Sequence, residues 1–225
     1  MIVHGAWADG SSWNKVIPLL QAKNLQVIAV QIPLTGLEDD LTATTRIIAD
    51  TEGPIVLVGH SWGGVAVTQA GTDPKVAALV YVSAFAPDIG ESGSSLIAQH
   101  PAPPALSTIV TDSAGFVYSN SRRRSEQRRA RHFHSRSADL GGNPAAACWK
   151  AFGQTVAQAA WKTKPTWFVV APGDCVVKDE LQQAEVKRMK AKTTVLQSSH
   201  MSLLSHPREV AAVIEDAAAT VAAKP

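Results

Sequence analysis

The stretch that most clearly suggests chemistry is Gly59-His60-Ser61-Trp62-Gly63. Its serine has a glycine two positions before it and another two positions after it. The apolar run "IVLV" precedes it and a helical pattern follows, so the serine falls at a strand-to-helix turn. A sharp turn there strains the backbone of the serine and brings neighbouring chain close, which favours glycine at both flanking positions. Its hydroxyl is then exposed at the carboxyl edge of a sheet. We therefore predict that Ser61 is a nucleophile.

A serine hydroxyl needs a base to activate it, and in turns of this kind the order along the chain is serine, acid, histidine. His200 follows the last predicted strand directly, in a loop at the carboxyl edge, and is the predicted base. His206, next to Pro207, is the weaker alternative because it looks like part of a helix start. The other five histidines either precede the required order or lie in an insertion: His4, His60, His100, His132 and His134.

The acid that orients the base is predicted from the same edge of the sheet. Asp174 stands just past the end of the strand-like run "PTWFVVA" and is the favoured residue. Asp88 also leaves a strand at this edge and remains a competitor. Asp179 looks instead like a charge in the first turn of a helix, where the helix dipole stabilises it.

Two backbone N–H groups are expected to stabilise the oxyanion that forms when the nucleophile attacks. The N–H of Trp62 lies at the start of the helix after the serine. The second donor should come from the loop after the first strand, where His4-Gly5 turns the chain and leaves the N–H of Ala6 available.

These residues require a sheet whose strands alternate with helices. Apolar runs without polar alternation indicate parallel strands buried on both faces, and the alternation with helical patterns indicates βαβ units. We predict an α/β fold with a mostly parallel central sheet of about six strands and helices on both faces. The predicted strands are 1–3, 25–33, 54–60, 75–87, 165–171 and 193–197, and the predicted helices are 11–24, 38–51, 61–72, 178–192 and 207–223.

The alternation of predicted strands and helices stops between about residues 87 and 164. This region is rich in Pro, Ser, Gly and Arg, and its only helical pattern is a loose one around 145–160. We therefore divide the chain into a core of residues 1–86 and 165–225 and an insertion at 87–164. Within the insertion, residues 119–136 contain seven arginines and one glutamate, a balance of +6 against +2 for the whole chain. A solvated loop is the favoured interpretation of this block. Nucleic-acid binding is disfavoured because aromatic residues are almost absent from it.

Composition excludes several classes of protein. Hydrophobic residues make up 45% and charged residues 18%, which argues against a disordered chain. No window approaches 18 consecutive apolar residues, so no membrane span is expected, and the N-terminus shows no signal peptide. Two cysteines, Cys148 and Cys175, are too few for a disulfide framework and suit a cytoplasmic location.

Taken together, these residues resemble the α/β-hydrolase family, and more narrowly its small bacterial esterase-like members related to plant methylesterases and hydroxynitrile lyases. Five stretches in order carry the resemblance: "VHGAWADGSSWNKVIPLL", "VLVGHSWGGVAVTQA", "VAALVYVSAFAPDIGES", "PTWFVVAPGDCVVKDELQ" and "SSHMSLLSHPREVAAVI". With the helices between them they cover about two-thirds of the chain. The resemblance implies the α/β-hydrolase fold, a triad of Ser61, Asp174 and His200, oxyanion amides at Ala6 and Trp62, and an insertion that caps the site. It implies neither a metal nor an organic cofactor. Residues 119–155 depart from the family's usual cap, so no family residue is transferred onto them.

The leading hypothesis is hydrolysis of a small carboxylic ester through an acyl-enzyme. A lyase of the hydroxynitrile-lyase type, an acyltransferase and a perhydrolase remain alternatives because the fold alone does not choose the acceptor. The expected partner is a small ester; no nucleic acid or membrane partner is expected, and a homodimer stays open. Aromatic residues expected near the site favour an uncharged substrate. They are Trp7, Trp13, Trp62 and Phe85.

Overall fold

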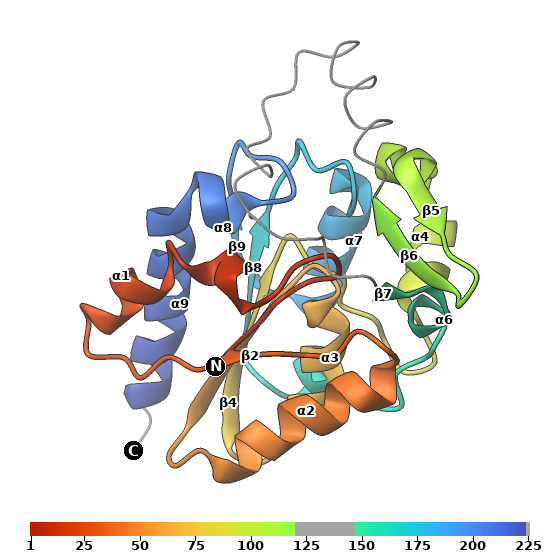
Figure 1. The fold of residues 1–225 in the computed structure, drawn as a ribbon. Coiled ribbons are helices and arrows are strands. Elements are labelled where there is room, and N and C mark those ends of the chain that lie inside the picture. Colours follow the sequence, from red (N-terminus) through yellow and green to blue (C-terminus); the bar gives the residue numbers. More distant parts are fainter. Residues whose placement is uncertain (120–146, 224–225) are drawn as a thin grey trace.

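A six-stranded parallel sheet forms the centre of the molecule (Figure 1). The computed structural model describes residues 1–119 and 147–223. The strands lie in the order β2-β1-β3-β4-β8-β9, and every neighbouring pair is parallel. Their bounds are β1 Ile2–Val3, β2 Ala29–Val30, β3 Ile55–His60, β4 Val76–Val82, β8 Thr166–Val170 and β9 Lys192–Val195. The prediction of a mostly parallel sheet of about six strands is confirmed.

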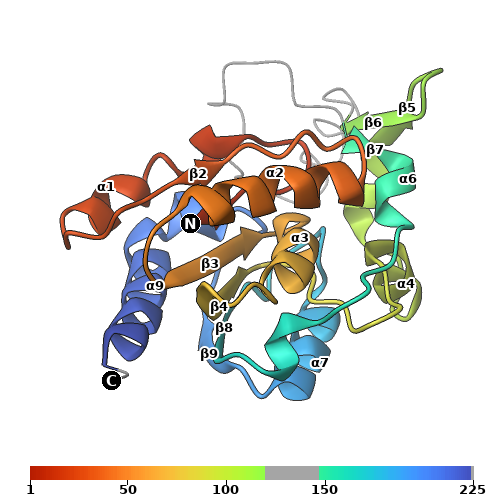
Figure 2. The same ribbon diagram turned by 90° about the horizontal axis from the view of Figure 1, so that it is seen from below.

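Helices cover both faces of this sheet, as predicted (Figure 2). The 3-10 helix η1 (Gly10–Trp13), α1 (Ile17–Gln21) and α9 (Pro207–Ala222) pack on one face. On the other face lie α2 (Leu37–Asp50), α3 (Gly63–Ala70) and α7 (Asp179–Met189). The one-turn helix α8 (Ser202–Ser205) lies between β9 and α9. The sheet therefore separates two hydrophobic clusters, one under each layer of helices.

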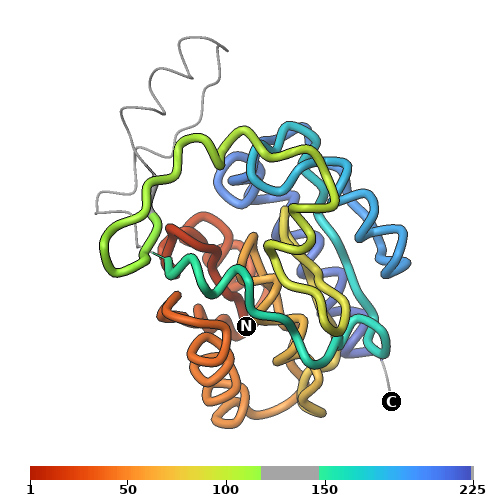
Figure 3. Tube along the Cα trace, turned by 90° about the vertical axis from the view of Figure 1, so that its right-hand side faces the viewer, coloured from red at the N-terminus to blue at the C-terminus, as the bar shows by residue number. Residues whose placement is uncertain are grey.

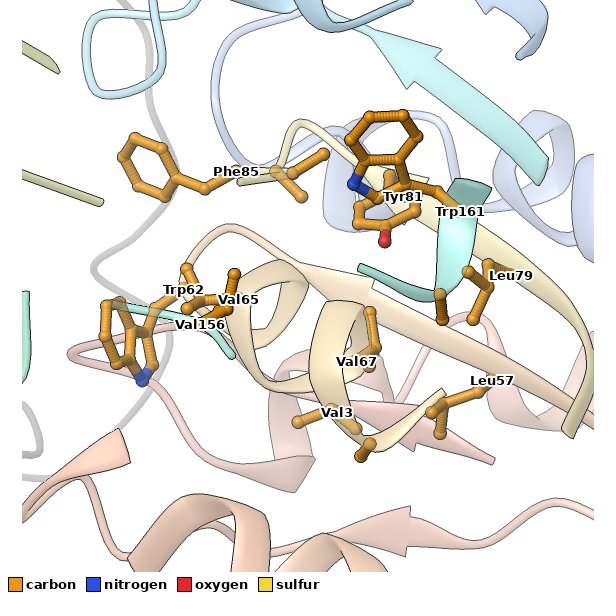
Figure 4. Close-up of a cluster of buried hydrophobic side chains, with 14 of the residues drawn as sticks. Val3, Leu57, Trp62, Val65, Val67, Leu79, Tyr81, Phe85, Val156 and Trp161 are labelled. Carbon is orange, nitrogen blue, oxygen red and sulfur yellow. The ribbon is translucent and has the colours of Figure 1, made fainter. Parts of the chain in front are cut away.

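Continuous apolar runs in the central strands follow from this burial on both faces. Six of the seven residues of β4 are buried, and from Ala78 to Val82 its side chains alternate between the two clusters. Tyr81 and Leu79 point into the cluster around α3, while Val80 and Val82 point towards α9. Figure 4 shows several side chains of the α3 cluster, with Trp62 and Phe85 near the start of that helix. An interior strand of this kind has no solvent-facing position for a polar residue.

Several predicted boundaries are wrong. The predicted strand 25–33 pairs only at Ala29–Val30, because its partner β1 offers two residues. The predicted helix 11–24 is split into η1 and the short α1. The predicted strand 75–87 stops at Val82, since Ser83 has a positive φ of 45° that turns the chain out of the sheet. Helix α7 stops at Met189 because Lys190 is left-handed.

The insertion contains strands that the sequence pattern did not predict. An antiparallel sheet joins β5 (Ile109–Thr111), β6 (Phe116–Ser119) and β7 (Ala147–Cys148). The side chain of Asp112 accepts the N–H groups of Ala114 and Phe116 at 2.9 Å each, which builds the hairpin turn between β5 and β6. In the described parts of the insertion, the other elements are helical: α4 (Gly93–Ala98), η2 (Pro104–Thr108), α6 (Trp149–Phe152) and η4 (Ala160–Lys162). Figure 3 views the molecule from the side on which this insertion lies.

Some expectations concern parts of the chain without a described structure. Of the arginine-rich block 119–136, only its first residue is described, and His132 and His134 lie outside the described residues. Within residues 1–119 and 147–223, no helix has the length and apolar character that a membrane crossing requires. A cavity of about 270 Å³ lies between the start of β3, the segment before β2 and α9, and none of the predicted site residues lines it.

Candidate active site

Ser61 occupies a strained turn between β3, which ends at His60, and α3, which begins at Gly63. Its φ is 53°, a left-handed conformation that is costly for any residue with a side chain. Two hydrogen bonds from neighbouring backbone hold it there: Phe85 N–H donates to the Ser61 carbonyl at 3.2 Å, and Ser61 N–H donates to the Val82 carbonyl at 3.3 Å. The turn is therefore fixed by the chain that leaves β4.

The two glycines of the motif are required by close backbone contacts. A Cβ at Gly59 would lie 2.6 Å from the carbonyl oxygen of Gly63. A Cβ at Gly63 would lie 2.7 Å from the carbonyl oxygen of His4. Both distances are far shorter than a carbon–oxygen contact permits, and backbone on both sides leaves no room to relax. The sequence-based explanation for the glycines agrees with this geometry.

His200 lies between Ser61 and Asp174. Its Nε2 is 2.9 Å from Ser61 Oγ, and its Nδ1 is 2.7 Å from Asp174 Oδ2. Since a carboxylate only accepts, Nδ1 carries a proton and Nε2 of the neutral ring presents its lone pair to the serine hydroxyl. The side chain of Asp174 is fully buried and that of His200 is 17% exposed. The structure thus brings together three residues that are separated by 139 and 26 positions along the chain.

Asp174 is held in place by the loop after β8. Its Oδ1 accepts the N–H groups of Val176 and Val177 at 2.7 and 3.0 Å, which leaves Oδ2 facing His200. Gln182 of α7 braces the same loop, because its side chain accepts from Ala171 N–H at 3.0 Å and donates to the Val177 carbonyl at 2.6 Å. The carboxylate therefore has a single orientation. Sequence reasoning missed Gln182, since a glutamine inside a helix carries no signal of this role.

The competing residues lie elsewhere. Asp88 forms an ion pair with Lys162 at 2.8 Å. Asp179 is the first residue of α7, as its pattern indicated. His206 precedes α9, and its Nδ1 is 2.9 Å from the hydroxyl of Ser205. His100 follows α4 in the insertion. For none of these is a contact with Ser61 or His200 found among the described residues.

The backbone N–H groups of Ala6 and Trp62 have no hydrogen-bond acceptor among the described residues. Ala6 follows Gly5, and a Cβ at Gly5 would lie 2.7 Å from the Cβ of Ser61, so this loop passes directly against the serine. Trp62 adjoins the serine at the start of α3. Two unoccupied donors beside a serine hydroxyl are suited to a developing negative oxygen.

Two further histidines support the site without belonging to the hydrogen-bonded chain of Ser61. His60 Nε2 donates to the carbonyl of His200 at 3.0 Å, which ties the strand end to the loop of the base. Burial, reinforced by the nearby His200 ring, holds the pKa of His60 well below its usual value. His4 accepts the N–H of Ile32 at 3.1 Å and contacts the Gly5 carbonyl, and burial lowers its pKa as well. Both rings therefore stay neutral, and that of His60 lies 4.7 Å from the ring of His200.

The expected aromatic lining is only partly realised. Trp13, Trp62 and Phe85 are each at most 1% exposed and are packed in the hydrophobic core. Trp7 is half-buried, stacks on Phe152 with ring centroids 5.9 Å apart, and donates its indole N–H to the backbone of β6 at 2.8 Å. Phe152 of the insertion was not anticipated. Its ring centroid also lies 4.7 Å from that of Trp62, so Phe152 joins the insertion to the turn that carries Ser61.

A buried carboxylate that sequence reasoning missed lies behind Trp62. Asp40 in the first turn of α2 accepts the indole N–H of Trp62 at 2.7 Å. The only signal in the sequence was its place in the acidic run Glu38-Asp39-Asp40, which is typical of a solvated helix start. No cluster of three or more His, Cys, Asp or Glu side chains suited to a metal ion is found in residues 1–119 and 147–223. Cys148 is half-buried.

Comparison with known proteins places these residues in context. A sequence model described as the alpha/beta hydrolase family matches residues 1–213. Methylesterase 1 of Arabidopsis thaliana is 32% identical over 115 residues, which is 42% of this chain and 40% of the methylesterase. An alpha-hydroxynitrile lyase of the same plant is 28% identical over 104 residues, 39% of this chain and 40% of the lyase. The chain thus spans about two fifths of the length of these curated relatives.

The overall fold is shared with solved structures over nearly the whole length. A crystal structure of the pyrethroid hydrolase PytH superimposes with a TM-score of 0.83 at 24% identity and covers 99% of this chain and 98% of that one. At this level of identity, the likeness concerns the fold.

Proposed function

The chain belongs to the alpha/beta hydrolase family, and from this premise we propose that it is a serine hydrolase that cleaves small carboxylic esters. The membership confirms the resemblance drawn from the sequence. The observation that carries the proposal is the pair of hydrogen bonds through which His200 joins Ser61 Oγ at 2.9 Å and Asp174 at 2.7 Å. The relatives named methylesterase and pyrethroid hydrolase support an ester as the substrate class.

In the first half of the proposed reaction, Ser61 Oγ attacks the ester carbonyl carbon while His200 Nε2 removes its proton. Asp174 keeps the Nδ1 proton of the imidazole in place and stabilises the imidazolium that forms. Collapse of the tetrahedral intermediate breaks the bond to the alcohol oxygen, which takes the proton from Nε2. The product is an acyl-enzyme on Ser61 and a free alcohol.

The N–H groups of Ala6 and Trp62 donate to the oxyanion of this intermediate, and the dipole of α3 adds to the positive potential at its start. In the second half, His200 removes a proton from water as the water oxygen attacks the acyl carbon. The second tetrahedral intermediate then releases Ser61, which regains its proton from His200, and the carboxylic acid leaves.

The proposed substrate is uncharged near the reacting carbonyl. Half-buried Trp7, which follows Ala6 and stacks on the buried Phe152 at 5.9 Å, offers an aromatic surface beside the proposed oxyanion donors. A series of p-nitrophenyl esters from acetate to octanoate measures the size of the acyl pocket, and a fall in kcat/KM beyond butyrate is expected for a small one.

Hydrolysis of p-nitrophenyl acetate and butyrate by wild type and by Ser61→Ala tests the proposal. We expect kcat to fall by about 10⁴ or more, the usual cost of removing a triad nucleophile. Ser199→Ala, a half-buried serine next to His200, is the matched control and should stay within about twofold of wild type. A fluorophosphonate should phosphonylate Ser61 of wild type with loss of fluoride, so that the protein gains the mass of the reagent less HF. A folded wild type that neither hydrolyses esters nor takes the label contradicts the proposal.

A C–C lyase on the same triad is the second candidate, because one relative is named alpha-hydroxynitrile lyase. Release of benzaldehyde from mandelonitrile, faster than ester cleavage, would favour it. An acyltransferase or perhydrolase would instead pass the acyl group from Ser61 to an added alcohol or to hydrogen peroxide in preference to water, which product analysis distinguishes.

A further inference from the structure

Asp40 is a fully buried carboxyl group that touches none of the proposed reacting atoms. Its Oδ1 accepts Leu34 N–H at 2.8 Å, and its Oδ2 accepts the indole N–H of Trp62 at 2.7 Å. Burial raises the pKa of Asp40 to about 6, while the bonds from Trp62 and Leu34 oppose this rise. A carboxyl group is costly at such a depth unless its hydrogen bonds are satisfied. The two hydrogen bonds therefore offset the cost of burying Asp40 and fix the orientation of its carboxyl group.

Trp62 is held at two points. Its backbone starts α3 directly after the strained Ser61, and its side chain is anchored by Asp40 and packed on Phe152 at 4.7 Å. The backbone N–H of this same residue is one of the two donors proposed for the oxyanion. The Ser61 carbonyl, in the same peptide plane as this N–H, accepts Phe85 N–H at 3.2 Å and Gly64 N–H at 3.0 Å. The indole, only 1% exposed, holds the Cα of Trp62 at the other end of that plane. The anchor on the side chain therefore restrains the direction of the N–H.

Asp40 itself is held by a rigid loop. Leu34 has a φ of 62°, and while its N–H donates to Asp40, its carbonyl accepts the N–H of Cys148 from the insertion at 2.8 Å. The side-chain oxygen of Gln154 accepts Leu37 N–H at 2.6 Å, at the start of α2. The segment that carries Asp40 is thus clamped between the core and the insertion.

We propose that Asp40 is a positioning residue, which fixes the backbone N–H of Trp62 in the oxyanion site by anchoring its indole. This inference rests on the proposed function, since it needs an oxyanion at Ser61. An oxyanion donor acts in the transition state and contributes little to substrate binding, so a misplaced donor lowers kcat and leaves KM nearly unchanged.

Asp40→Asn is the first variant, because it keeps the shape and removes one acceptor. One of its two oxygens becomes an NH₂ group that meets either Leu34 N–H or the Trp62 indole N–H, so one bond is lost. Removing a whole oxyanion donor costs about 10² to 10³ in kcat. For a displaced donor we expect a fall of about tenfold in kcat on p-nitrophenyl butyrate, with KM within about twofold. Asp39→Asn, on the same helix turn and bonded to Thr35, is the matched control and should match wild type.

Trp62→Phe removes the other partner and keeps the Asp40 bond to Leu34. We expect a similar loss of kcat, and no additional loss when both substitutions are combined, because the amide oxygen at position 40 can then accept Leu34 N–H and only the bond between positions 40 and 62 is missing. The inhibition constant of a phenylboronic acid, which forms a tetrahedral anionic adduct with the serine, should rise in parallel with the loss of kcat/KM. If the hydrogen bond between Asp40 and Trp62 had a purely structural role, the variants would lose thermal stability, but the inhibition constant would not follow the loss of kcat/KM.

The outcomes separate the two proposals. If wild type is active and both single variants keep its kcat, or lose activity through KM alone, the role of Asp40 is refuted while the triad stands. If Asp40→Asn does not fold, Trp62→Phe decides by the same criteria. If wild type neither hydrolyses esters nor takes the fluorophosphonate label, the proposed function fails, and the role of Asp40 fails with it.

Discussion

Glu185 makes the stability of this protein depend on pH in a way that can be calculated. This carboxyl group of α7 is 1% exposed, and its Oε1 accepts Ala86 N–H at 2.7 Å. Its Oε2 has no hydrogen-bond partner among the described groups. Burial raises the pKa of Glu185 from 4.5 to about 8, although the Ala86 N–H and the Arg188 guanidinium oppose the shift. The folded protein therefore holds a proton here at neutral pH.

The sign and size of the effect follow from proton linkage. Between pH 4.5 and pH 8 the folded state binds the proton and the unfolded state does not, so the free energy of unfolding falls as pH rises. Each pKa unit corresponds to about 1.4 kcal/mol. Compared with a neutral side chain at this position, Glu185 should lower the free energy of unfolding by under about 1 kcal/mol at pH 5, about 3 kcal/mol at pH 7 and about 4 kcal/mol at pH 8.

Glu185→Gln mimics the protonated form and removes this dependence. Urea unfolding followed by tryptophan fluorescence at pH 5, 6, 7 and 8 should show that the free energy of unfolding of the variant, relative to wild type, increases by about 1 kcal/mol per pH unit. Glu180→Gln, at an exposed position on the same helix, is the matched control for the loss of one carboxylate from α7. The reasoning is refuted if the free energies of unfolding of wild type and Glu185→Gln change with pH in the same way from pH 5 to pH 8. It is also refuted if wild type becomes more stable as the pH rises.

Three further substitutions test the site. Gly59→Ala places a Cβ 2.6 Å from a backbone oxygen in the first turn of α3, so we expect a loss of at least about 3 kcal/mol in urea unfolding or no soluble protein; a stable variant contradicts the close packing. Asp174→Asn should lower kcat by about 10⁴, as the loss of the orienting carboxylate does in a triad, whereas Asp88→Asn should stay near wild type; equal losses would reject the assignment of the acid. His200→Gln should abolish turnover and His206→Gln should not, as measured by p-nitrophenyl butyrate hydrolysis, and the reverse order would reassign the base.

Much of the site was predictable because its determinants are local. A strand followed by Gly59-His60-Ser61-Trp62-Gly63 contains the turn and the reason for its glycines within five residues. The positions of Asp174 and His200 follow from a topological rule, since the carboxyl ends of parallel strands meet at one edge of the sheet. The unpredicted β5–β7 sheet shows the limit, because short strands in an insertion depend on partners that the local pattern does not name.

The sequence alone thus determined the fold class, the strand-to-helix turn at Ser61 and the order of the candidate site residues along the carboxyl edge of the sheet, because periodicity and backbone sterics act over a few residues. Only the tertiary structure decided what each buried polar side chain faces. Asp40 accepts a hydrogen bond from Trp62, 22 positions away, and Glu185 accepts one from Ala86, 99 positions away, and no local pattern indicates either contact. Packing moves such groups out of water, and once they are buried, the few donors within reach decide their ionisation and their role.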